Sequence, residues 1–250
     1  MVRMVEMVES QEHRKDHPHD RLSPGSSSGW LVGGNRGVLL FAALLITLDL
    51  VIFAIDLYAR ALGLPNVTFY VDTDRGFGEL VQYVKYAWLM MLVGFYAVEN
   101  RTWRVAMWLP VFAFFLVDDA FEGHEYAGFQ LAQSLGLGGL GMRAQDVGEV
   151  LFFAIAGVVF LVLLLIGYVG AELRTRRIYH VFAVLMVAVA FFGIVLDAVH
   201  RMVVDIPVLG SGVAFAEDAG EMLTVTAMVV FAVRINLSGG QRGFPERDRV

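Results

Sequence analysis

The sequence predicts an all-α fold: a polytopic membrane bundle of about six transmembrane helices with both termini in the cytoplasm. Hydrophobic residues make up 57% of the 250 residues, and the mean hydropathy is +0.63. Soluble domains contain roughly 45–50% apolar residues. The apolar residues come in long runs, which favours one polytopic helical unit. The arginines are unevenly distributed between the connecting segments, which gives the orientation.

Three regions follow from this distribution. Residues 1–36 are polar and interrupted by Pro18 and Pro24, so they form a disordered cytoplasmic tail that buries too little apolar surface to fold. Residues 37–235 form the six-helix transmembrane domain, and residues 236–250 a short basic cytoplasmic tail. The first residues are interrupted by charge and lack the apolar core of a signal peptide.

The composition excludes several classes of site. The chain has no cysteine, so it has neither a thiolate metal site nor a cysteine nucleophile. Its net charge of −6, without a Lys/Arg-rich stripe, argues against a nucleic-acid partner. A bound metal must be held by carboxylate, imidazole or backbone oxygen, which suits iron, manganese, zinc, calcium or magnesium better than Cu(I).

Three predicted spans make up the first half of the domain. They are Val38 to Leu62, Leu80 to Val98 and Trp103 to Phe121. Runs of this length cross roughly 30 Å of hydrocarbon. The first contains Asp49 near its middle.

Three further spans follow a glycine-rich segment, residues 126–143, which either lies flat or re-enters the membrane. They are Ala144 to Gly170, Ile178 to Val199 and Val213 to Val233. A basic turn, with Arg174, Arg176 and Arg177, separates the first two of these.

Orientation follows from the arginines beside the spans. The side that holds both termini carries Arg36, Arg101, Arg104, Arg174, Arg176, Arg177 and Arg234. The opposite side carries mainly Arg60, Arg75, Arg143 and Arg201. By the positive-inside rule the first side is cytoplasmic, in an inner or plasma membrane.

Charged residues inside the first two spans need partners, because an intramembrane charge is costly unless it faces the bundle interior. Asp49 and Asp56 lie seven residues apart on one helical face, and Lys85 lies one turn inside the second span. Lys85 can pair with either carboxylate or snorkel to the interface. The same three residues are candidates for an ion path.

Acidic and histidine-bearing helix ends form the main candidate site. The stretch LVDDAFEGHEYAGFQ, residues 116–130, ends the third span, and three other polar helix ends lie on the same, non-cytoplasmic side. The candidate metal ligands are Asp118, Glu122, His124, Glu149, Asp197, His200, Glu217 and Glu221. Four such ends distributed at random would not all choose one side.

Spacing supports this interpretation. Asp197 and His200 are three residues apart and so share a helical face, as carboxylate and histidine ligands do in metal-binding bundles. His124 points away from Asp118 on a continuous helix, so it joins the site only if the chain turns near Gly123. Solvated interfacial charge and helix-dipole stabilisation are the alternative explanation for the outermost acidic groups.

The segment VDDAFEGHE, residues 117–125, resembles the Asp-Asp/Glu then His-Glu signature of small, largely uncharacterised prokaryotic multi-pass membrane proteins. EDAGEM, residues 217–222, resembles a late acidic motif of the same group. The resemblance implies a prokaryotic integral membrane protein. The chain lacks the His-x3-His pair of the alkaline ceramidase and adiponectin-receptor class, so that three-histidine zinc site is not expected.

Three functions fit the sequence. The first is a membrane metalloprotein with a divalent-metal site, which includes a metal-dependent enzyme as one form. The second is a cation or proton transporter or channel that uses the intramembrane carboxylates. The third is a non-catalytic membrane subunit. The lipid bilayer is a partner in each case, and a homo-oligomer or a second membrane protein is compatible with all three.

Overall fold

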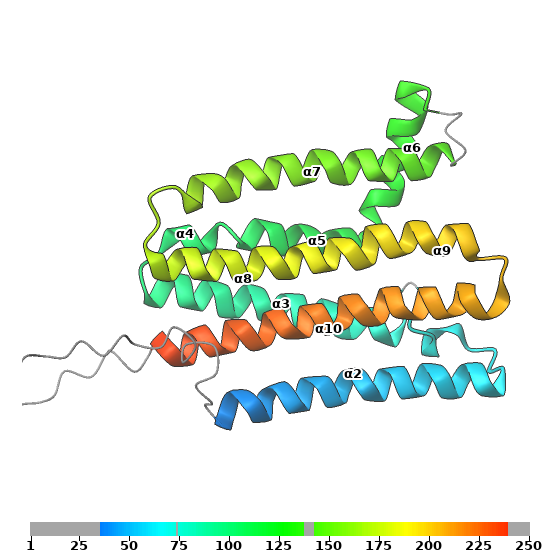
Figure 1. Cartoon of the computed structure of the whole chain (residues 1–250), viewed down its shortest axis with the longest axis horizontal. Coiled ribbons are helices and arrows are strands. Elements are labelled where there is room, and N and C mark those ends of the chain that lie inside the picture. The colour runs from blue at the N-terminus through cyan, green and yellow to red at the C-terminus, as the bar shows by residue number, and fades with distance from the viewer. Residues whose placement is uncertain (1–35, 74, 138–142, 240–250) are drawn as a thin grey trace, which may run out of the picture. The chain divides into compact units, whose positions relative to one another are not determined.

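The computed structural model describes residues 36–73, 75–137 and 143–239, and this part of the chain is helical without any strand (Figure 1). Among these described residues, five helices are long and apolar enough to cross a membrane, as expected of a membrane protein. They are Arg36–Leu62, Phe77–Glu99, Ala144–Tyr168, Leu173–Val203 and Val208–Ser238. Of the predicted cytoplasmic tails, residues 1–35 and 240–250 lie outside the described residues.

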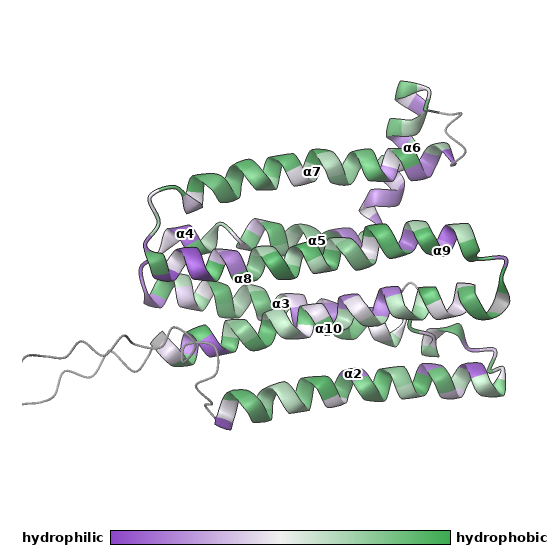
Figure 2. Ribbon diagram, in the orientation of Figure 1, coloured by the Kyte–Doolittle hydropathy of each residue, from purple (hydrophilic) through white to green (hydrophobic). Residues whose placement is uncertain are grey.

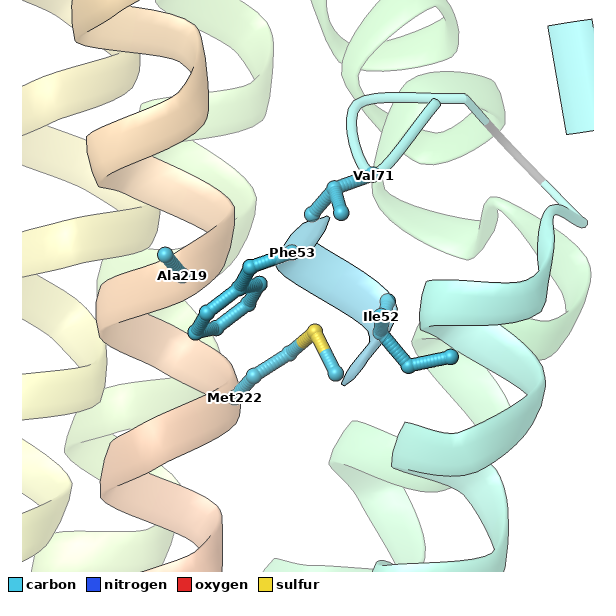
Figure 3. Packing of buried hydrophobic residues seen from close by; sticks show 5 residues of the cluster. All are labelled: Ile52, Phe53, Val71, Ala219 and Met222. Carbon is cyan, nitrogen blue, oxygen red and sulfur yellow. The ribbon is translucent and has the colours of Figure 1, made fainter. Parts of the chain in front are cut away.

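The last helix, α10 (Pro207–Gly239), packs against both α2 (Arg36–Leu62) and α3 (Phe77–Glu99). Figure 3 shows an apolar cluster between α2 and α10, in which Phe53 and Met222 point toward one another. Ile52, Ala219 and Val71 complete it, and Val71 comes from the loop that follows the short helix η1 (Val67–Phe69). The cluster joins the first and last membrane helices.

The predicted third span is not one continuous helix. It consists of α4 (Trp103–Ala106) and α5 (Leu109–Phe121). With 13 residues, α5 is too short to be counted with the five helices that could cross a membrane alone. Pro110 lies in the first turn of α5 and has no N–H to donate to the preceding turn. The N–H groups of Met107 and Trp108 bond three residues back instead, so the chain tightens between the two helices.

The glycine-rich segment contains a helix, α6 (Gly123–Leu135), that packs against α7 (Ala144–Tyr168). Figure 1 shows α6 running across the N-terminal part of α7. The contact depends on two glycines. A Cβ on Gly128 would lie 2.8 Å from the backbone nitrogen of Glu149, and one on Gly148 would lie 2.7 Å from the carbonyl carbon of Gly128. Small residues let membrane helices approach this closely.

We expect Gly148→Ala to lower the free energy of unfolding by about 1–3 kcal/mol, because the new methyl group must push α6 away from α7. Gly157→Ala on the same helix is the matched control, since no heavy atom lies within 4 Å of its Cβ position. Alanine favours a helix over glycine, so the control should be neutral or stabilising. Thermal unfolding in detergent measures both variants, and equal stability of the two would contradict the packing argument.

The fifth predicted span is longer than expected and contains a wide turn. It comprises α8 (Leu173–Ala190), the π-helical turn η2 (Phe191–Leu196) and α9 (Asp197–Val203). The basic residues expected in the preceding turn form the first turn of α8, where Arg176 lies over the Tyr168 ring. Any side chain at Gly193 in η2 would collide with the Glu221 carboxylate, so η2 and α10 approach closely there.

The polar helix ends meet at one end of the bundle, on the right in Figure 1. This end holds α6, α9 and the N-terminal ends of α7 and α10. In Figure 2 the hydrophilic colour concentrates along α6 and at the neighbouring ends of α7 and α9. The fold therefore collects the charged residues that the sequence distributes over separate segments.

Candidate metal centre in an acidic cavity

A cavity of about 670 Å³ lies between α3, α5, α7, α10 and the α8 to α9 segment, and we call it the central cavity. Its polar end is lined by carboxylates and two histidines. All eight sequence-predicted ligands line it: Asp118, Glu122, His124, Glu149, Asp197, His200, Glu217 and Glu221. The fold thus brings the eight candidate ligands to the central cavity, although they do not all contact one another.

Three of the eight lie at metal-binding spacing. One ligand atom from each of Asp197, His200 and Glu217 lies within 4.8 Å of the other two. Asp197 and His200 are one turn apart on α9, and Glu217 faces them from α10. The His200 Nδ1 atom lies 3.8 Å from a Glu217 carboxylate oxygen, and all three side chains are half-buried. We call these three residues the triad.

Arg201 connects the triad to α7. Its Nε donates to Asp197 Oδ1 at 3.0 Å, and its Nη2 donates to Glu149 Oε2 at 3.1 Å. It also contacts Asp146 Oδ1, the oxygen to which Arg143 Nη2 donates at 2.8 Å. One oxygen of Asp197 is therefore held by a guanidinium, the kind of outer contact that orients a metal ligand.

The second histidine forms a separate pair. Glu122 adopts the left-handed conformation with φ of 52°, so α5 ends there and α6 begins at Gly123. This turn brings His124 Nδ1 to 3.0 Å from Asp118 Oδ2. Burial alone lowers the pKa of His124, but the hydrogen bond and charge of Asp118 outweigh it and raise the pKa above its usual value.

Two other predicted ligands are engaged by arginines instead. Glu122 pairs with Arg75 at 3.1 Å, and Glu149 pairs with Arg201. Glu221 lies against Gly193, one helical turn from Glu217. These three line the central cavity but contribute no atom to the triad.

The charges within α2 and α3 form their own network. Lys85 Nζ lies 2.5 Å from Asp49 Oδ1 and 3.1 Å from the Met222 carbonyl oxygen, while Thr226 Oγ1 donates to Asp49 Oδ2 at 2.6 Å. Lys85 and Asp49 are 1% and 0% exposed. Of the two carboxylates that the sequence offers to Lys85, the structure therefore pairs it with Asp49.

Asp56 has different partners. Arg60, one turn later on α2, donates to both of its carboxylate oxygens at 3.0 Å, and the Val71 N–H donates to Oδ1 at 3.0 Å. Arg60 also binds Asp72 and lies over the Tyr70 ring. Asp56 thus holds the loop after η1 against α2.

Sequence reasoning overlooked two residues of the central cavity. The arginine distribution marks Arg201 only as a flanking charge, although its position four residues after Asp197 on one helical face is a usable signal. Gln82 on α3 also lines the central cavity, and its Oε1 is buried with no hydrogen-bond partner among the described residues. No short-range pattern identifies Gln82, because its surroundings come from other helices.

Comparison with known proteins gives a family without an assigned activity. No curated protein and no solved structure matches the chain. One family model, described as a domain of unknown function, matches residues 37–235 and so covers most of the chain. The chain belongs to this family, DUF8692, and shares with it the whole helical region that carries the central cavity.

Proposed function

We propose that this protein is an integral membrane metalloprotein that binds a divalent cation at Asp197, His200 and Glu217. The observation that carries the proposal is the triad itself, because two helices place three ligand atoms within 4.8 Å of one another. Arg201 binds one oxygen of Asp197, and the two carboxylates and the imidazole of the triad still lie close enough together to share a further cation. The neighbouring carboxylates of the central cavity add to the attraction for a cation.

The ligand types favour particular ions. Imidazole suits iron and zinc and carboxylate suits manganese, so one imidazole with two carboxylates is compatible with each of these three ions. When bound, such an ion supplies Lewis-acid chemistry, water activation or, for iron and manganese, redox chemistry. The protein residues would hold the ion, and Arg201 would orient Asp197 toward it.

The membrane arrangement that we propose has six spans, with α4 and α5 together as the third. Both termini are then cytoplasmic, and the triad lies toward the non-cytoplasmic face. The arginine distribution beside the spans supports this orientation. The resemblance of residues 117–125 to prokaryotic multi-pass proteins favours a prokaryotic plasma membrane.

The test is elemental analysis of protein purified in detergent without chelator. We expect iron, manganese or zinc in stoichiometric amount in the wild type and its loss from His200→Ala/Glu217→Ala, because two of three ligands are gone. The control variant, His180→Ala/Glu172→Ala, makes the same changes outside the triad, where His180 contacts Tyr168. A wild type that stays metal-free after incubation with each ion, or a triad variant that keeps its metal, would refute the site.

Cation or proton translocation is the second candidate. It uses Asp49, Asp56 and Lys85 inside the spans, and the buried Lys85–Asp49 pair is the observation in its favour. We rank it below metal binding because fixed partners occupy these groups, with Thr226 and Met222 completing the contacts of the pair. Flux through proteoliposomes that Asp49→Asn abolishes would reverse this ranking, as would metal-free protein that conducts.

A further inference from the structure

The central cavity extends beyond the acidic end along the apolar faces of three helices. On α7 the lining residues recur every three or four positions from Glu149 to Leu164, so a single face of that helix forms one wall. The same spacing holds on α8 and η2, and Phe114 and Phe115 line the cavity from α5. Each wall is polar at the triad end and apolar farther along.

The apolar part of the wall has the length of a lipid chain. Leu164 lies fourteen positions after Val150, so at about 1.5 Å per residue this part is about 21 Å long. That is more than half of the roughly 30 Å hydrocarbon thickness of a bilayer. The volume of about 670 Å³ lies within the range of small-molecule binding sites.

Small residues keep the space open beside α7. Ala156 and Gly157 line the central cavity on this helix, and Ala183 and Ala190 line it on α8. No heavy atom lies within 4 Å of the Cβ position of Gly157, which is exposed. Only 6% of the apolar window of α7 is buried, so most of this helix is exposed.

The polar end is suited to a headgroup that donates hydrogen bonds. In the described part of the chain, four half-buried carboxylates of the central cavity make no ion pair with Arg, Lys or His: Glu79, Asp119, Asp218 and Glu221. Gln82 adds a carbonyl oxygen that is buried without a hydrogen-bond partner, in a side chain only 5% exposed. Hydrogen-bond acceptors that carry negative charge favour a cationic headgroup and disfavour a phosphate or carboxylate headgroup.

We propose that the central cavity binds a membrane amphiphile with a single long apolar chain and a protonated amine headgroup. The chain lies along α7 and α8, and the amine reaches Gln82 and the carboxylates beside it. This inference rests on the proposed function insofar as it names the substrate class of the metal site. The headgroup contacts Glu79 and Gln82 on α3 and Asp119 on α5 are separate from the triad, whereas Asp218 and Glu221 lie beside Glu217 on α10.

The experiment uses full-length protein in phosphatidylcholine nanodiscs and a hexadecylamine probe that carries a photoreactive diazirine in its chain. A palmitic acid probe with the same diazirine controls for labelling from the lipid phase. We expect saturable labelling of residues 150–164 and 183–194, about tenfold stronger with the amine and competed by unlabelled hexadecylamine. Equal labelling by the two probes, or labelling spread evenly over the outer helix faces, would overturn the proposal.

Variants sharpen the test. Gly157→Trp fills the central cavity at a position where the fold tolerates a side chain, so it should remove most of the specific labelling. Gly212→Trp is the matched control, because Gly212 also has open space at its Cβ position but does not line the central cavity. Gln82→Leu should weaken amine labelling while leaving the chain contacts intact. Wild-type labelling of Gly157→Trp would contradict the assignment of the apolar wall.

The two proposals fail in distinguishable ways. Amine labelling that depends on Gly157 in a protein without metal would refute the metal site and support the amphiphile site. Stoichiometric metal that is lost with His200 and Glu217, together with labelling indifferent to headgroup and to Gly157, would do the opposite. Elemental analysis and photolabelling of the same preparations give both answers.

Discussion

Replacing Lys85 by methionine is expected to lower the free energy of unfolding by about 3–5 kcal/mol, the usual cost of breaking a buried ion pair from one side. Methionine keeps the length of the side chain but leaves Asp49 with Thr226 as its remaining partner. Asp49 is fully buried between α2, α3 and α10, so no water can replace the lost ammonium group. Thermal or denaturant unfolding in detergent, followed by tryptophan fluorescence, measures the loss.

The double variant Asp49→Leu/Lys85→Met is the control for this prediction. Removing both charges restores an apolar interior, so its stability should return to within about 1 kcal/mol of the wild type. Equal destabilisation in the single and double variants would mean that packing, and not the unpaired charge, sets the cost. The double variant also separates structure from transport, since a folded protein without these two charges cannot use them to move ions.

Arg201→Ala is expected to have the second largest effect, a loss of about 2–3 kcal/mol. Arg201 contacts carboxylates of two helices, Glu149 on α7 and Asp197 on α9, and its removal leaves both without a cation. The side chain is 31% exposed, so solvent reduces the cost below that of the fully buried Lys85 pair. Unfolding must be measured with and without chelator, because a bound cation would compensate part of the lost charge.

Arg143→Ala is the matched control, because Arg143 and Arg201 both bind Asp146. The Arg143 side chain is 70% exposed and lies three residues from its partner, so its removal should cost at most about 1 kcal/mol. Arg201→Lys should fall between the two, since lysine keeps the charge but lacks the planar fork that binds several carboxylates. A similar cost for Arg143→Ala and Arg201→Ala would contradict a special role of Arg201.

The sequence by itself determined the membrane class and most of the helices. Long apolar runs marked α2, α3 and α7 within about three residues of their observed ends and found α8 and α10 with ends displaced by five residues or more, because a run of this length is stable in hydrocarbon only as a helix. It also placed the polar helix ends together, since successive spans must alternate in direction. The break between α4 and α5 was not predicted from the sequence. Pro110 is the local signal for this break, because proline has no backbone N–H to donate.

The tertiary structure alone decided which charged residues meet. The sequence offered Lys85 two carboxylates, and only the position of α10, with Thr226 and the Met222 carbonyl, shows why Asp49 is the partner. Likewise, eight candidate ligands line the central cavity, but only three of them form the triad. Glu149 instead forms an ion pair with Arg201. Spacing along one helix fixes which side chains share a face, whereas the distance between faces depends on packing among helices far apart in the chain.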